Sequence, residues 1–155
     1  MKVKVPGISI ASISICIPKN EVNLVDLPSY FGKSEVNKII KTTGINSIRR
    51  AEKNTTTSDL CAFAVKKMMD ETGTTPDQID AILFVSQTPD YKLPQTSHIL
   101  QSKLGLKEDT ICFDLPIGCN GYVYGLFQAS ILINTKACKR VLLLSGDTTT
   151  KLIND

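Results

Sequence analysis

The chain has 155 residues, 42% of them hydrophobic and 21% charged, which is the composition of a single folded domain and excludes a disordered or collagen-like chain. The net charge of +3 is spread along the chain, so a nucleic-acid partner has little support. No run approaches the ~20 apolar residues of a membrane span, so no membrane association is expected.

The first 57 residues carry weak structural signals. Isoleucines alternate over residues 8–17 but change parity halfway, which predicts either a bulged strand or a strand buried on both faces. Two short helices are expected at residues 24–30 and 35–42, the second with Ser34 as its N-cap and Gly44 as its stop. A polar loop is expected over residues 54–57.

From residue 58 onwards, helical patterns alternate with short apolar runs. In chain order we expect a helix over 58–73, a strand over 81–85, a helix over 95–104, a strand over 111–115, a helix over 120–134 and a buried strand over 141–144. This alternation favours an α/β layered fold with a largely parallel sheet. A functional loop is expected from Ser145, and the chain stops ten residues later without a closing element, which suggests a truncated domain.

The segment from Phe113 to Leu126 carries the strongest chemical signal. A strand runs into a sharp turn, and Cys119 lies where the following helix begins. The first turn of a helix presents free N–H groups and a positive dipole end, which stabilise a thiolate and make its sulfur a nucleophile. From position alone, however, a lone cysteine before a helix is more often a core residue than a catalyst.

The helix that follows is apolar nearly all round, which predicts that it is the buried centre of a larger layered structure. Gly121 and Gly125 are four residues apart and share one face. Each costs about 1 kcal/mol relative to alanine inside a helix. The sequence therefore predicts that another backbone packs closely against this face.

This segment resembles the nucleophile motif of β-ketoacyl-acyl-carrier-protein synthase III, a thiolase-like condensing enzyme. Similar stretches follow the family order elsewhere: Thr43, Gly44 and Ile45 with Arg49 and Arg50 after them, then residues 101–106 and 143–147. The resemblance implies that the whole chain, residues 1–155, is one thiolase-like domain, the N-terminal half of a five-layered αβαβα sandwich.

The resemblance also implies an acyltransferase reaction in two steps. Cys119 accepts an acyl group from a thioester, and malonyl-acyl carrier protein then loses carbon dioxide to give a carbanion that attacks the bound acyl carbonyl. Acyl carrier protein is the implied partner, with an acyl thioester as substrate and no cofactor. The His and Asn that assist this reaction in the family belong to its C-terminal half, so the chain alone is expected to be inactive in the full condensation.

Further site residues follow from matching positions. Leu93 corresponds to a residue that reaches across a homodimer interface to line the partner's acyl pocket, and Gly118 and Asn120 flank the nucleophile. The positions of three coenzyme A contacts are occupied by Lys38, Thr42 and Lys151, so the donor could be acyl-CoA or an acyl carrier protein. Arg49 and Arg50 could receive the acidic carrier protein or form an ordinary solvated basic face.

The remaining polar and sulfur groups are interpreted as structural. The chain has five cysteines and no C-x-x-C pair, which favours a reducing cytosol and a cytoplasmic protein. Cys61, Cys112 and Cys138 are expected to pack in the interior, and Asp114 and Asp147 to brace turns. The single histidine, His98, is expected on a helix surface, and no metal site is recognised.

Two other functions stay open at this stage. The chain could be a non-catalytic thiolase-like module that binds or assembles with a partner, or part of a condensing enzyme of the HMG-CoA-synthase or polyketide type. An acyl adduct on Cys119 would separate the catalytic readings from the binding module.

Overall fold

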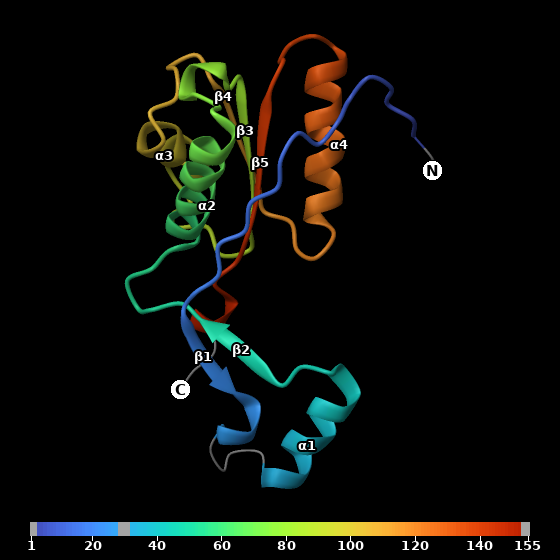
Figure 1. Ribbon diagram of the computed structural model, residues 1–155, viewed down its shortest axis with the longest axis vertical. Coiled ribbons are helices and arrows are strands. Elements are labelled where there is room, and N and C mark those ends of the chain that lie inside the picture. The colour runs from blue at the N-terminus through green and yellow to red at the C-terminus, as the bar shows by residue number, and fades with distance from the viewer. Residues whose placement is uncertain (1–2, 28–31, 153–155) are drawn as a thin grey trace.

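The computed structural model describes residues 3–27 and 32–152 (Figure 1). Its elements in chain order are β1 (Asn20–Asn23), η1 (Leu24–Asp26), α1 (Gly32–Thr43), β2 (Ser47–Arg50), α2 (Thr57–Thr72), η2 (Pro76–Gln78), β3 (Ala81–Val85), α3 (Thr96–Lys103), β4 (Ile111–Leu115), α4 (Gly121–Asn134), β5 (Val141–Ser145) and η3 (Thr149–Lys151).

Three parallel strands form the sheet that organises the molecule, in the order β4-β3-β5. The central strand β3 is buried along its whole length, as expected of a short apolar run with no polar alternation. In register, Val85 at the end of β3 lies between Leu115 of β4 and Ser145 of β5. The three predicted strands and the parallel α/β class are confirmed.

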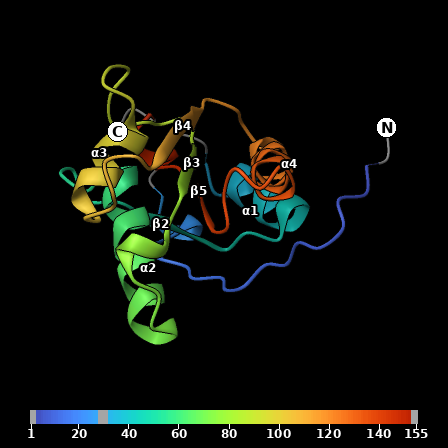
Figure 2. The same ribbon diagram turned by 90° about the horizontal axis from the view of Figure 1, so that it is seen from above.

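Helices cover both faces of this sheet, with α2 and α3 on one side and α4 on the other (Figures 1 and 2). The hydrophobic core lies between the sheet and the α2–α3 layer; its members include Cys61, Ala62, Val65, Met69, Ile82, Phe84, Leu100, Leu104, Leu142 and Leu144. Helix α2 begins with a capping box between Thr56 and Asp59 and ends at Gly73, whose φ of 67° is the left-handed conformation glycine tolerates.

Helix α4 differs from its prediction, because it is not buried all round. Only Gly121 and Gly125 are buried, where the helix meets the sheet, while Val123 and Tyr124 are 65% and 55% exposed. Within residues 3–27 and 32–152 no second layer covers its outer face. Apolar composition therefore indicated how much of the helix surface is hydrophobic, but not what covers it.

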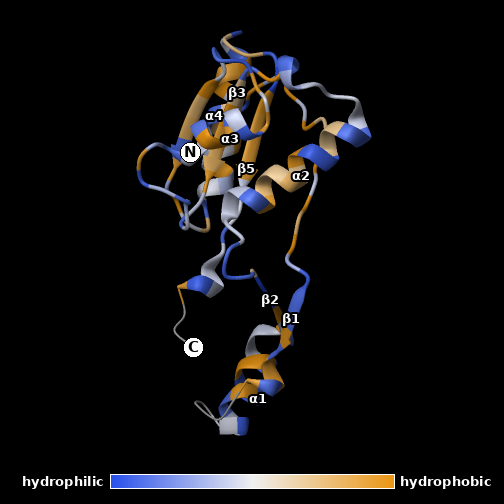
Figure 3. Ribbon diagram, turned by 90° about the vertical axis from the view of Figure 1, so that its left-hand side faces the viewer, coloured by the Kyte–Doolittle hydropathy of each residue, from blue (hydrophilic) through white to orange (hydrophobic). Residues whose placement is uncertain are grey.

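A second unit lies beyond the end of the sheet; it consists of the antiparallel pair β1 and β2 and of η1 and α1, which lie between these two strands in the chain (Figures 1 and 3). Strand β2 was not expected, since its residues Ser47–Arg50 contain one apolar side chain and two arginines. Helix α1 begins at Gly32, so Ser34 lies inside it and is not its N-cap as predicted. Of the helix expected over 24–30, only η1 is seen, and residues 28–30 lie outside the described residues.

The strand predicted over residues 8–17 is wrong. This segment forms no strand pair in the described part of the chain, and Ile13 and Ile15 are 72% and 77% exposed. A strand requires partners for its N–H and C=O groups, and alternating isoleucines do not supply them. Neither the bulge nor the double burial proposed from the parity change is present.

Candidate active site at the N-terminus of α4

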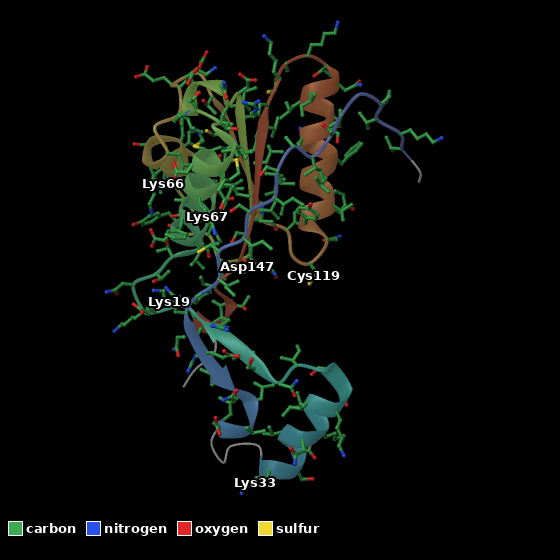
Figure 4. The ribbon with its side chains drawn as sticks, viewed as in Figure 1. Lys19, Lys33, Lys66, Lys67, Cys119 and Asp147 are labelled. Atoms are coloured by element: carbon green, nitrogen blue, oxygen red, sulfur yellow. The ribbon has the colours of Figure 1, made fainter. Side chains whose placement is uncertain are left out.

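Cys119 lies in the turn that joins β4 to α4. The turn is tight, because the Ile117 N–H donates to the Leu115 carbonyl at 2.8 Å and the Gly121 N–H to the Gly118 carbonyl at 2.7 Å. Cys119 is exposed, and Figure 4 shows it at the sheet edge where α4 begins. The strand, turn and helix predicted around this residue are confirmed.

Helix α4 begins at Gly121, two residues after the cysteine. Asn120 occupies the N-cap position and its side chain makes no capping hydrogen bond. The positive end of the α4 dipole therefore faces the turn that carries the Cys119 sulfur. An anionic sulfur, or an oxyanion formed on a carbonyl that it attacks, is stabilised at such a position.

Two glycines seat α4 on the sheet close to this turn. A Cβ atom at Gly121 would lie 2.5 Å from Val85 Cγ1, and one at Gly125 would lie 2.5 Å from Leu143 Cδ1. The close approach predicted for this face is present, but its partner was predicted wrongly. Side chains of β3 and β5 approach the glycines, where a second backbone was expected.

Asp147 braces the loop that follows β3. Its Oδ1 accepts hydrogen bonds from the Gln87 N–H at 2.7 Å and from Ser86 Oγ at 3.0 Å, and both the N–H and the hydroxyl of Thr88 donate to it at 3.1 Å. The Thr148 N–H in turn donates to Thr88 Oγ1 at 2.9 Å. This carboxylate holds the ends of β3 and β5 together, which confirms its interpretation as a turn brace.

Asp114 has the same kind of role at α3. Its two carboxylate oxygens accept the N–H groups of Thr96 and Ser97, each at 2.8 Å. Because these are the first N–H groups of α3, the carboxylate caps that helix from the neighbouring strand β4. Asp114 is engaged in structure on the α3 side, away from the α4 face of the sheet.

Gln87 is a site residue that the sequence analysis missed. Its side-chain Cδ and Oε1 atoms lie 3.2 Å from the position that a Cβ atom at Gly118 would occupy, next to Cys119. A signal was available, because Gln87 and Gly118 follow the neighbouring parallel strands β3 and β4. The ends of such strands meet at one edge of the sheet.

Four of the five predicted coenzyme A or carrier-protein residues lie in the second unit, and the structure does not gather them around Cys119. Lys38 and Thr42 are exposed on α1, on the far side of the β1–β2 pair from the sheet (Figure 1). Arg49 makes a 2.9 Å ion pair with Glu21, and Arg50 is half-buried beside it on β2.

Lys151 tethers η3 to the linker that leads into α2. Its Nζ donates to the Lys53 carbonyl at 2.9 Å. Lys151 therefore lies next to the segment that joins the two units. Its amine already has a hydrogen-bond partner within the chain.

Leu93 and His98 lie on the α3 side of the sheet. Leu93 is 83% exposed in the loop before α3, and His98 is exposed on that helix, as expected for a surface imidazole. A cavity of about 250 Å³ lies beside the loop; its lining residues are Phe84, Ser86, Pro89, Tyr91, Lys92, Gln95, Asp114 and Pro116. Cys119 is not among these lining residues.

The other cysteines differ from Cys119 in their surroundings. Cys61 is buried among core residues, and this burial raises the pKa of its thiol to about 12. Burial likewise raises the pKa of Cys112, on β4, and of Cys138, in the turn after α4. All three are packing residues, as predicted.

Residues 3–27 and 32–152 contain no group of three or more His, Cys, Asp or Glu side chains placed to hold a metal ion. In the same ranges no helix has both the length and the apolar character that crossing a bilayer requires.

Comparison with known proteins finds synthase III sequences and structures. Residues 113–155 match the family model for 3-oxoacyl-[acyl-carrier-protein (ACP)] synthase III. The chain is 32% identical to the beta-ketoacyl-[acyl-carrier-protein] synthase III of Chlamydia caviae, over 97% of the chain and 44% of that protein. It thus spans less than half the length of the curated relatives it matches.

Solved structures agree in fold. A 3-oxoacyl-(acyl-carrier protein) synthase from Burkholderia xenovorans is 40% identical with a TM-score of 0.84, covering 90% of this chain and 40% of that one. The synthase III of Thermus thermophilus is 28% identical with a TM-score of 0.81, covering 91% and 43%. The chain therefore has the thiolase-like fold and is related to the N-terminal half of β-ketoacyl-acyl-carrier-protein synthase III.

Proposed function

We propose that the protein carrying this chain is a condensing acyltransferase of the synthase III type, with Cys119 as the residue that accepts the acyl group. The observation that supports this proposal is the position of Cys119. This exposed cysteine lies in a tight strand-to-helix turn, inside the segment that matches the family model. Of the other cysteines, Cys61 and Cys138 are buried.

The first half-reaction uses groups that this chain contains. The Cys119 thiolate attacks the carbonyl carbon of an acyl thioester, and the donor thiolate leaves and takes up a proton. The new thioester bond joins the acyl group to the Cys119 sulfur. The N-terminus of α4 favours the anionic sulfur before attack, and Gly118 and Asn120 shape the space around the bound acyl group.

The second half-reaction forms the carbon–carbon bond. Malonyl-acyl carrier protein loses carbon dioxide, the resulting carbanion attacks the acyl carbonyl on Cys119, and the thiolate leaves. The single histidine of the sequence, His98, lies on α3, across the sheet from α4, so it does not assist this step. We therefore propose that the 155-residue chain by itself carries the acyl group but does not complete the condensation.

The partners in this proposal are a thioester donor and acyl carrier protein, with no cofactor, in the cytoplasm. The relatives' names include the carrier protein, which supports it as substrate carrier. The exposed Leu93 supports a homodimer in which this side chain reaches the partner's acyl pocket. Lys38, Thr42, Arg50 and Lys151 would then contact coenzyme A or the carrier protein.

Arg49 fits the carrier-protein role less well than the sequence suggested. Its guanidinium is already engaged by Glu21, and its Nη1 also donates to the Lys19 carbonyl at 3.0 Å. An acidic partner would have to compete with both, so its charge contributes to steering and less to direct contact.

Acyl transfer to the chain is the direct test. Incubation with acyl-CoA or with an acyl-carrier-protein thioester, followed by peptide mass spectrometry, should show an acyl adduct on Cys119. Cys119→Ala should abolish the adduct, and Cys16→Ala should leave it unchanged. Absence of any adduct with both donors would contradict the proposal and favour a non-catalytic binding or assembly module.

Condensation by the chain alone is the second test. The purified 155-residue chain with an acyl donor and malonyl-acyl carrier protein should release no 3-oxoacyl product. Product at a rate above that of Cys119→Ala would show that the chain holds all groups needed for the second half-reaction.

A further inference from the structure

The backbone that precedes Cys119 lies beside a side chain from the loop that follows β3. Gly118 has no side chain, and the carboxamide of Gln87 occupies the space next to its Cα atom. The Nε2 atom of Gln87 would lie 3.4 Å, and its Cδ and Oε1 atoms 3.2 Å, from a Cβ atom at Gly118. A Cβ atom at Gly118 would therefore be crowded by this amide, so Gln87 fills the space on that side of the turn.

Gln87 itself is held from the opposite side. Its N–H donates to Asp147 Oδ1 at 2.7 Å, and the next residue, Thr88, donates to the same oxygen twice. A backbone fixed at two consecutive N–H groups restricts where the Gln87 side chain can go. A continuous series of contacts therefore runs from Asp147 through Gln87 to Gly118 and the turn that carries Cys119.

We propose that Gln87 is a positioning residue for Cys119, which keeps the turn before α4 in the conformation that places the sulfur at the helix N-terminus. Gly118 belongs to the same arrangement, because a Cβ atom at this position would compete with the Gln87 side chain for the same space. The inference rests on the proposed function, since it gives Gln87 its role through the nucleophile. Gln87 acts by packing, so its shape matters more than its hydrogen-bonding groups.

The expected effect is on rate and not on folding. Gln87 is exposed, so replacing its side chain removes little buried surface. A small displacement of a reacting atom, however, costs on the order of tenfold to a hundredfold in rate. For Gln87→Ala we expect about a tenfold slower acyl transfer to Cys119, with a melting temperature close to that of the unaltered protein.

The variants separate packing from other roles. Gln87→Met keeps the length of the side chain without its amide, so it should restore acyl transfer to within about threefold of the unaltered chain. Gly118→Ala should slow transfer on its own. Adding Gln87→Ala to it should bring little further loss, because both changes act on one contact. Gln128→Ala, two turns along α4 from Gly121, is the matched control and should leave the rate unchanged.

Two readouts on the full chain decide the outcome. Acyl transfer is timed by mass spectrometry, and alkylation of Cys119 by iodoacetamide is timed against alkylation of Cys16 in the same chain. In Gln87→Ala the ratio of the Cys119 rate to the Cys16 rate should change, because only the turn that carries Cys119 is displaced. A merely structural role would not change this ratio.

Failure of this inference is distinct from failure of the proposed function. If the unaltered chain takes up no acyl group, the proposed function is wrong, and the alkylation ratio still tests Gln87. An unchanged ratio in Gln87→Ala would overturn the positioning role. It would also be overturned by acyl transfer within twofold of the unaltered chain, or by additive losses in the double variant.

Discussion

The first turn of α4 provides a sharp test of how the helix is seated on the sheet. In Gly121→Ala the new Cβ atom would lie 2.5 Å from Val85 Cγ1 and 3.2 Å from Ile117 Cβ, where ordinary contacts are 3.4 Å or longer. Val85 is 3% exposed and β-branched, so its χ1 angle has little freedom. Either β3 or the turn that carries Cys119 must move.

The size of the effect follows from two opposing contributions. Alanine is preferred over glycine inside a helix by about 1 kcal/mol, but Gly121 is the first helical residue and gains less than that. Overpacking a well-filled site costs about 1–3 kcal/mol. We therefore expect Gly121→Ala to lower the free energy of unfolding by about 1–2 kcal/mol.

Equilibrium urea unfolding followed by circular dichroism measures this change, and Gly146→Ala is its control. A Cβ atom at Gly146 would lie 3.5 Å from Cys61 Sγ and Thr57 Cγ2, which is ordinary contact, and this glycine does not have a positive φ. We expect that substitution to change the free energy of unfolding by no more than about 0.5 kcal/mol.

A double-mutant cycle identifies the atom responsible. Val85→Ala removes the methyl group that meets the new Cβ atom, so Gly121→Ala should cost about 1 kcal/mol less in the Val85→Ala background than in the unaltered chain. The reasoning is refuted if Gly121→Ala unfolds at the same urea concentration as the unaltered protein. It is also refuted if the two substitutions are additive.

Two further predictions concern ionisable groups. The hydrogen bond from Lys103 to Asp59 holds the pKa of the Asp59 carboxyl below its ordinary value of 3.8. The ionised carboxylate therefore stabilises the folded protein above about pH 4, and this stabilisation is lost as the pH falls through the lowered pKa. Unfolding of Asp59→Asn should therefore depend less on pH between 5 and 2 than unfolding of the native chain, and an equal slope would contradict the assignment. In the folded protein at pH 8, iodoacetamide should label the exposed Cys119 well before the buried Cys61. Peptide mass spectrometry measures the labelling of each cysteine. Equal labelling of the two would show that the site is wrongly assigned.

Much of the sheet and of the nucleophile turn could be predicted from sequence, because the signals there are local. Residues 81–85 are five consecutive apolar side chains, and such a run specifies a strand covered on both faces. Gly73 and the residues around Thr56 mark the ends of α2 through capping groups within a few residues. The turn that carries Cys119 was predicted in the same way, from the strand before it and the helix after it, whereas the role of the cysteine came from the resemblance to synthase III.

The predictions that failed depend on contacts between distant segments. Ile13 and Ile15 alternate as in a strand, yet a strand exists only where another segment offers hydrogen-bond partners, and no pattern within residues 8–17 reports that. The face of α4 was correctly expected to be closely packed at Gly125. The identity of the atoms that pack there, from Leu143, depends on the register between β5 and the helix.

The same reasoning explains why Gln87 was missed and why it matters. The ends of β3, β4 and β5 meet at one edge of the sheet, and the loops after them carry Gln87, Cys119 and Asp147 respectively. Figure 4 shows Cys119 and Asp147 near this edge. These residues are far apart along the chain, and only the parallel register brings them together. The proposed role of Gln87 therefore links the carboxylate after β5 to the turn after β4 through the loop after β3. On this proposal, substitutions in all three loops disturb the turn that carries Cys119, even where the local motif around the cysteine is preserved.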